Sequence, residues 1–281
     1  MVVSDGGVLR FGLAPATWDA RIDARLSAFS RALAAQIGMS VLPIASSDYR
    51  GIVGAIARGE VDVAWLPPLV ALRGVAEGSL LPLALPIRGG VSSFSAVLFA
   101  QRGSGIHAVE DLRGKRVAWV DRQSASGYLV VRAHLEEIGV DPDTMFSREV
   151  FCGTHPRVVY AVATGDADVG ATYACIDSAG QLRSAAWIEC GLPIDVEIVL
   201  ATSHVPADVV AMSRTTPAQE GRLVQDALIG ARPGSPLSRA IGELFHAEGF
   251  ELPAPSHFAP LARVLHAMGD PRRFPSVPPP R

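Results

Sequence analysis

A hydroxyl-bearing segment stands where the sequence predicts a strand to end and a helix to begin. Ser124, Ser126 and Gly127 follow the apolar run at residues 117–120 and precede apolar residues at helical spacing that stop at Gly139. A helix N-terminus has unpaired N–H groups and a partial positive charge, and small hydroxyl residues add donors there. The segment is therefore a candidate oxyanion-binding site. The other interpretation is that one serine only caps the helix.

A second candidate donor, His155, comes from an internal repeat. Residues 48–63 and 154–169 share one register: a ring-bearing residue (Tyr49 or His155) opens an apolar helix, and a glycine, an acidic residue and an Asp-Val pair follow. This register predicts two lobes of similar build. In open α/β sheets, ligands bind beyond the C-terminal strand ends. If the lobes face each other, Tyr49, His155 and the Ser124 segment converge on one cleft.

The elements that must position these residues alternate along the chain. Apolar runs predict strands at residues 8–14, 41–45, 61–66, 80–87, 94–100, 117–120, 149–152, 169–172 and 194–200. Helical spacing predicts helices at 22–37, 52–57, 129–138 and 155–163, and mainly helical patterns after 206. Such alternation is typical of an α/β fold with largely parallel sheets. The strands at 94–100 and 194–200 are the expected hinge crossings.

Composition and motifs exclude several classes of function. The 281 residues are 49% hydrophobic and 19% charged with a net charge of −3, so a full core is expected and nucleic acid is not. No apolar run reaches about 18 residues, which argues against membrane insertion. Cys152, Cys175 and Cys190 lack metal-site spacing, and neither a metal nor a cofactor is expected. The sequence has no Gly-x-Ser-x-Gly turn and no nucleotide-binding glycine loop, so we do not expect an enzyme.

A set of short motifs occurs in a specific order and spacing. They are Asp48-Tyr49-x-Gly-Ile-Val, Val61-Asp-Val-Ala-Trp65, Phe94-Ser-Ala-Val-Leu, Gly105-Ile, Asp111-Leu-x-Gly-Lys115, Ser124-Ala-Ser-Gly-Tyr128, Gly153-Thr-His155 and Leu192-Pro-Ile-Asp195. Together they resemble the phosphonate-, phosphite- and phosphate-binding components of ABC importers over about residues 8–260. The resemblance implies a type II periplasmic-binding-protein fold with a ligand cleft between two lobes and two hinge crossings. Lobe 1 would hold residues 1–95 plus 200–281, and lobe 2 residues 96–199.

The resemblance also implies which residues bind the ligand. The family's Ser-Thr-Ser-Gly cradle matches, in order, Ser124, Ala125, Ser126 and Gly127. The middle hydroxyl is therefore missing, while the backbone N–H groups remain. The family's phosphonate-binding histidine matches His155, and its first-lobe tyrosine matches Tyr49.

The positions that would receive an amine on the ligand are largely changed. A second aromatic position, usually tyrosine, falls on Phe94, and one carboxylate position falls on Cys175, expected to be a neutral thiol near pH 7. The other carboxylate matches Asp195, and Asp177 could supply the missing charge if its turn shifts. We therefore expect a simpler oxyanion in preference to 2-aminoethylphosphonate.

The resemblance implies a monomeric substrate-binding protein that captures a small oxyanion for an ABC permease. It also implies the periplasm after removal of a leader, whereas residues 1–7 lack a signal-peptide pattern and leave the cytoplasm open. Two alternatives stay open at this point. One is an enzyme on the same bilobal fold, such as the lyases of menaquinone biosynthesis, and the other is a cytoplasmic ligand-sensing domain.

Overall fold

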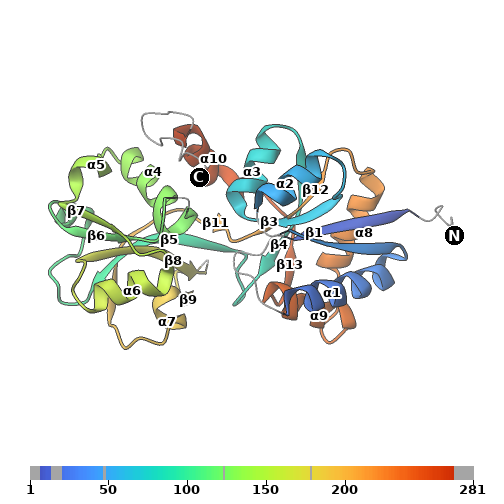
Figure 1. Cartoon of the computed structure of the whole chain (residues 1–281). Helices are drawn as coiled ribbons and strands as arrows, with labels where there is room; N and C mark the ends of the chain where they lie inside the picture. Colours follow the sequence, from blue (N-terminus) through green and yellow to red (C-terminus); the bar gives the residue numbers. More distant parts are fainter. Residues whose placement is uncertain (1–6, 14–20, 47–48, 123, 178, 269–281) are drawn as a thin grey trace. The chain divides into compact units, whose positions relative to one another are not determined.

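The computed structural model describes residues 7–13, 21–46, 49–122, 124–177 and 179–268 (Figure 1). The chain divides into two compact units. The first runs to Ser92 and resumes over Pro206–Pro255, and the second spans Ser93–Val205 together with the stretch from Ser256. These units differ from the predicted lobes in two respects. The chain passes from one unit to the other at slightly different residues, and most of the last helix, with the buried Leu261 and Val264, is grouped with the second unit.

The first unit is built on a six-stranded mixed sheet with the order β13-β4-β12-β3-β1-β2. Its strands are β1 (Val8–Leu13), β2 (Ser40–Ala45), β3 (Val63–Leu66), β4 (Leu80–Ile87), β12 (Val209–Ser213) and β13 (Gly249–Glu251). Its helices are α1 (Ile22–Ile37), α2 (Tyr49–Ala57), α3 (Pro68–Ala76), α8 (Ala218–Ile229) and α9 (Pro236–Phe245). β2 and β3 run parallel to β1, whereas β12 is antiparallel to its neighbours β3 and β4.

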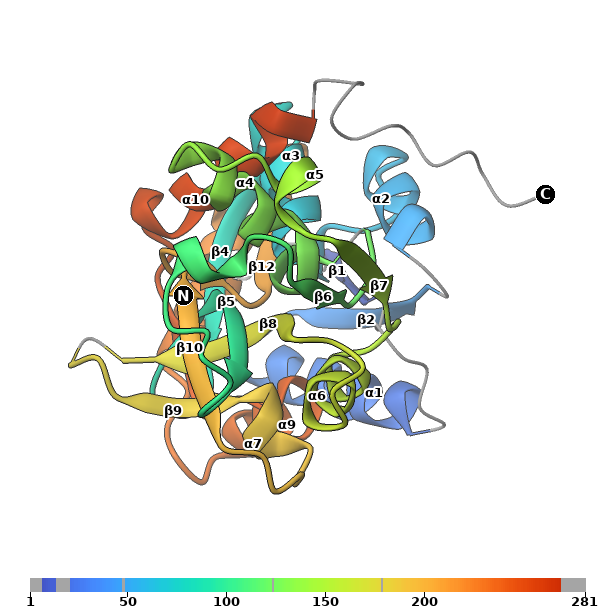
Figure 2. The same ribbon diagram turned by 90° about the vertical axis from the view of Figure 1, so that its left-hand side faces the viewer.

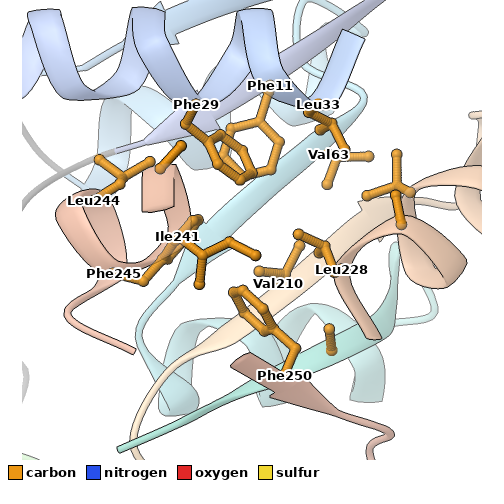
Figure 3. Close-up of a cluster of buried hydrophobic side chains, with 14 of the residues drawn as sticks. Phe11, Phe29, Leu33, Val63, Val210, Leu228, Ile241, Leu244, Phe245 and Phe250 are labelled. Atoms are coloured by element: carbon orange, nitrogen blue, oxygen red, sulfur yellow. The ribbon is translucent and has the colours of Figure 1, made fainter. Parts of the chain in front are cut away.

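Aromatic packing holds the core of this unit together (Figure 3). Phe11 of β1, Phe29 of α1 and Phe245 of α9 are fully buried, with ring centroids 4.9 Å apart for Phe11 and Phe29 and 5.0 Å for Phe29 and Phe245. Each contributes about 1.5–3 kcal/mol relative to an exposed ring. Apolar residues at helical spacing turn one face of α1 toward this core, and α1 ends at Gly38 with φ 70°.

The second unit has a seven-stranded sheet with the order β10-β5-β8-β6-β7, to which β9 and β11 add at β8 and β5. Its strands are β5 (Ser93–Gln101), β6 (Arg116–Trp119), β7 (Arg148–Phe151), β8 (Val169–Ile176), β9 (Leu182–Ala185), β10 (Val196–Ala201) and β11 (Val205–Pro206). Its helical elements are η1 (Val109–Leu112), η2 (Ala125–Leu129), α4 (Val130–Glu137), α5 (Pro142–Met145), α6 (His155–Ala163) and α7 (Ala186–Glu189). The last helix, α10 (Pro255–Met268), follows β13. Figure 2 shows α4 and α5 on one face of the sheet and α6 and α7 on the other.

An arginine–aspartate clamp recurs at the edge of each sheet where the central strands begin. Arg10 of β1 donates from its backbone N–H and its guanidinium to Asp62, which directly precedes β3. In the same way Arg116 of β6 donates to Asp168, which directly precedes β8. Each clamp joins one strand (β1 or β6) to its neighbouring parallel strand (β3 or β8), so the internal repeat extends to side-chain contacts.

No helix among the described residues is both long and apolar enough to cross a membrane. Among the same residues no group of three or more histidine, cysteine, aspartate or glutamate side chains is placed to hold a metal ion.

Candidate functional site

The candidate oxyanion cradle lies in the second unit, where β6 ends. Ser124 adopts an extended conformation, and its hydroxyl accepts a hydrogen bond from the Gly127 amide at 3.1 Å. The next turn, Ala125–Leu129, is π-helical, because the Leu129 amide donates to the Ser124 carbonyl at 3.0 Å. It leads directly into α4. The predicted strand-to-helix junction is present, but the helix begins with a wider turn than the sequence indicated.

The wider turn changes how many amides are available. In an α-helix the Ser124 carbonyl would accept from the Tyr128 amide, four residues on. Here it accepts from Leu129. Among the described residues the amides of Ala125 and Ser126, at the start of this turn, have no backbone acceptor. Ser126 as a whole residue is 6% exposed, and its hydroxyl makes no hydrogen bond to another described residue. Unpaired N–H groups at a helix start are the donors that an anion uses.

Gly127 is required by close packing against the end of β6. A Cβ at this position would lie 2.3 Å from a methyl carbon of Val120, much closer than two carbon atoms can approach. The Val120 amide donates to the Gly127 carbonyl at 3.1 Å, and the Val120 carbonyl accepts from the Gly153 amide at 2.7 Å. Val120 therefore joins the turn before α4 to the turn before α6.

His155 is the first residue of α6 and lies at the same edge of the sheet as the cradle. β6 is parallel to both β7 and β8, so the C-terminal ends of these strands share one edge. The Nδ1 atom of His155 lies 2.8 Å from Oγ1 of Thr172 on β8. Burial lowers the pKa of His155, while the nearby carboxylates of Asp121 and Glu189 act in the opposite direction.

An aromatic wall stands beside His155. The Tyr173 ring packs edge-on against His155 with 5.0 Å between centroids, and the Phe94 ring is 6.4 Å from that of Tyr173. The Tyr173 hydroxyl donates to Glu189, and burial together with this carboxylate raises the pKa of Tyr173. The sequence analysis missed Tyr173, Thr172 and Glu189. A polar threonine inside the apolar run of β8 was the available signal.

A cation flanks the cradle without entering an ion pair with a described carboxylate. The Arg122 guanidinium lies over the Phe151 ring, 4.6 Å from its centroid, and donates to the Tyr128 hydroxyl at 3.2 Å. Tyr128 belongs to the π-helical turn and also packs against Trp119, with 5.3 Å between ring centroids. Stacking therefore holds a positive charge two residues before Ser124.

The structure does not bring Asp195 to this site. Asp195 precedes Val196, which pairs with Gln101 at the far end of β5, and its carboxylate accepts from Arg102 at 3.0 Å. Because β5 is antiparallel to β8, that end of β5 lies at the edge opposite the cradle. We therefore correct the expectation from the resemblance and leave Asp195 out of the candidate site.

Two other residues considered for an amine, Asp177 and Cys175, lie in a hairpin, and the side chain of the predicted ligand residue Tyr49 lies outside the described side chains. Asp177 closes the β8–β9 turn, accepting from the amides of Ala179 and Gln181 and from Arg183. Cys175 pairs with Ser184 within the same hairpin. Tyr49 opens α2 in the first unit, as the repeat predicts, but its side chain lies outside the part of the chain that the structure describes.

Comparison with known proteins identifies the family. The family model for ABC transporter, phosphonate, periplasmic substrate-binding proteins matches residues 11–258, and the chain belongs to this family. The phosphate-import protein PhnD of Mycolicibacterium smegmatis is 31% identical over 166 residues, which cover 56% of this chain and 52% of that protein. The matched segment thus spans about half the length of this curated relative.

Solved structures share the fold. XAC2383 from Xanthomonas citri, bound to chloride, has a TM-score of 0.72 at 23% identity, covering 92% of this chain and 98% of that one. PhnD1 from Prochlorococcus marinus, in complex with methylphosphonate, has a TM-score of 0.64 at 17% identity, covering 93% and 98%. At these identities the likeness confirms the predicted fold class, an α/β type II periplasmic-binding-protein fold. The expectation of largely parallel sheets was wrong, because both sheets are mixed.

Proposed function

We propose that this chain captures a small oxyanion, a phosphonate, phosphite or phosphate-like ligand, for an ABC importer. The observation that carries the proposal is the π-helical turn after Ser124. It presents the Ala125 and Ser126 amides, which have no backbone acceptor among the described residues, together with the side chain of the buried Ser126, and His155 lies at the same sheet edge. Family membership supports an ABC permease as the partner, a periplasmic location and binding without chemical turnover.

The site would offer donors to three oxygens of a tetrahedral oxyanion. Amides and hydroxyls from residues 124–128 would bind two of its oxygens, and His155 would donate to a third. Tyr49 is proposed to contribute a further contact to the ligand. Phe94 has no hydroxyl and, with the Tyr173 ring, gives an apolar surface to a hydrogen or methyl substituent.

A zwitterionic aminoalkylphosphonate fits this site less well. A buried ammonium needs carboxylates or other acceptors to replace its water, because an unpaired buried charge costs several kcal/mol. Asp195 lies at the opposite sheet edge, and Asp177 is engaged in a turn. Glu189 is the carboxylate beside the aromatic wall, and it already accepts from Tyr173.

Thermal unfolding in the presence of phosphate, phosphite, methylphosphonate, sulfate and 2-aminoethylphosphonate tests the ligand class. A ligand at 100 times its dissociation constant adds about 2.7 kcal/mol of stability. We expect at least one simple oxyanion to stabilise the protein more than 2-aminoethylphosphonate does. Preference for 2-aminoethylphosphonate in competitive calorimetry would contradict this proposal, and Glu189→Gln would then be the first variant to make.

Loss of single donors tests the assignment of the site. His155→Ala and Ser126→Ala should each weaken oxyanion binding by about 1–3 kcal/mol, the range for a hydrogen bond to a charged group. Ser238→Ala in α9 of the first unit is the control for serine removal and should bind normally. Unchanged affinity in both site variants by calorimetry would refute the site while leaving the fold untouched.

A further inference from the structure

The contact between His155 and Thr172 fixes more than the position of the ring. Thr172 lies on β8 with no exposed surface, and its Oγ1 is 2.8 Å from Nδ1 of His155. Two proton arrangements fit this distance. Either the threonine hydroxyl donates to Nδ1, or Nδ1 carries a proton and donates to the hydroxyl oxygen.

Hydrogen-bond satisfaction decides between the two arrangements. If Nδ1 donated, the Thr172 proton would need another acceptor, and this hydroxyl makes no other hydrogen bond among the described residues. A buried hydroxyl proton without an acceptor is unfavourable, as is any buried unsatisfied donor. The threonine is therefore the donor, and Nδ1 accepts. A neutral ring that accepts at Nδ1 carries its own proton on Nε2.

We propose that Thr172 is a positioning residue that holds His155 as a neutral imidazole with its proton on Nε2, ready to donate to an unprotonated oxygen of the ligand. The donation from His155 to a ligand, the ligand half of this inference, rests on the proposed function. The tautomer of His155 does not depend on a ligand.

The charged and titratable groups around His155 are consistent with a neutral ring. Burial lowers its pKa, against the effects of Asp121 from the β6–η2 loop and Glu189 from α7. Tyr173 of β8 packs edge-on to the ring and engages Glu189 through its hydroxyl. An imidazolium would carry a proton on Nδ1 as well, which would again leave the buried Thr172 proton without an acceptor.

A neutral donor has a consequence for ligand selection. The histidine then recognises a hydrogen-bond acceptor on the ligand rather than ligand charge, and a protonated oxygen at that position would accept a weaker hydrogen bond than an ionised one. Binding should therefore not weaken merely because the pH rises through the usual histidine pKa of about 6.5. A site that used an imidazolium would lose affinity over that range.

Nitrogen-15 NMR of the imidazole rings tests the tautomer on the whole protein without ligand. The His155 signals among the seven histidines are assigned by their loss in His155→Gln. At pH 7 we expect the signature of a neutral ring protonated at Nε2 in the wild type and in Thr172→Ser. In Thr172→Val, which keeps the side-chain shape, the ring should populate both tautomers.

Titration with methylphosphonate and with inorganic phosphate, at pH 6 to 8, tests the ligand half. Thr172→Val should weaken binding about three- to tenfold, the effect of one net hydrogen bond, and Thr172→Ser should restore it to within about twofold. The matched control is Thr216→Val in the first unit, which removes another buried threonine hydroxyl, one that donates to the Asp62 carbonyl at 3.2 Å. It should bind like the wild type.

Each outcome decides a separate statement. An imidazolium or an Nδ1-protonated ring in the wild type at pH 7 would overturn the inference, as would Thr172→Val with an unchanged tautomer and unchanged affinity. If the wild type shows the Nε2-protonated ring but binds neither anion, the proposed function fails and the ligand half of the inference fails with it. The positioning of His155 by Thr172 would then still stand.

Discussion

In the first unit Arg10 clasps Asp62, and in the second Arg116 clasps Asp168, with partners 52 residues apart in both cases. Both clamps lie where the parallel strands begin. Each sheet also has an antiparallel strand beside the second strand of its clamp, β12 next to β3 and β5 next to β8. In the second unit, β6 leads into a π-helical turn with serine side chains. The repeated part is thus structural, and the candidate oxyanion cradle belongs to the second unit.

The largest expected difference between the units concerns two buried glycines. Gly127→Ala places a Cβ 2.3 Å from Val120, and Gly12→Ala places one 2.5 Å from Ile52. Overpacking of this kind costs about 1–3 kcal/mol, so both variants should unfold at lower denaturant concentration. Gly127→Ala should also weaken oxyanion binding about a hundredfold, since it displaces several donors of about 1 kcal/mol each. If calorimetry showed the same oxyanion affinity for Gly127→Ala and Gly12→Ala, the turn at Gly127 would not be the binding site.

The two clamps should differ in strength because they differ in burial. The Asp62 side chain is 12% exposed and that of Asp168 is 30% exposed. Asp62→Asn should lower the free energy of unfolding by about 1.5–3 kcal/mol, the range for a hydrogen bond to a charged group, and Asp168→Asn by about 1 kcal/mol or less. Chemical denaturation at pH 7 measures both values. A larger loss of unfolding free energy in Asp168→Asn than in Asp62→Asn would show that burial does not determine which clamp is stronger.

The second clamp also has a pH dependence of known sign. Hydrogen bonds from Arg116 hold the pKa of Asp168 below its usual value. A carboxyl group with a lowered pKa stabilises the fold above its ordinary pKa of about 4, and this contribution disappears as the pH falls through the lowered value. The stability difference between the wild type and Asp168→Asn should therefore be constant from pH 7 to 5 and shrink below about pH 4. A difference that grows in acid would contradict the assignment.

The smallest expected difference concerns two helix caps of the same geometry. Ser124 caps the turn before α4 and Ser235 caps α9, each accepting an amide hydrogen bond at 3.1 Å. Replacing either serine with alanine should cost about 1 kcal/mol of stability. Only Ser124→Ala should also weaken oxyanion binding, by about threefold to tenfold. If both variants lose the same stability and neither loses affinity, Ser124 is only a cap.

The sequence predicted the fold well where one local signal dominates. The helices of residues 22–37 and 155–163 have the predicted bounds, because apolar spacing is a strong local signal and a glycine such as Gly38 favours a helix end. The mainly helical structure expected after residue 206 is present in α8, α9 and α10, but the sequence did not predict the strand β12. Its five residues are all buried, and a short apolar run of this kind does not distinguish a strand from a helix.

Several properties of the candidate site depend on contacts between distant segments, and no local pattern reports them. The π-helical turn needs Gly127 to pack on Val120, and the Thr172 contact needs α6 to dock on β8. Asp195 matched a family position in sequence, but the antiparallel pairing of β10 with β5 sets it at the other edge of the sheet. The roles of Tyr49, Ser124, Ser126 and His155 in binding remain predictions.

Val120 lowers the entropy cost of ligand binding at the cradle. Through its amide and its carbonyl it bonds to Gly127 on one turn and Gly153 on the other, so neither turn can rearrange independently. A ligand that binds here therefore orders little additional backbone, because these loops are already ordered when the protein folds. Amide hydrogens of these two turns should consequently exchange slowly with solvent before any anion is added.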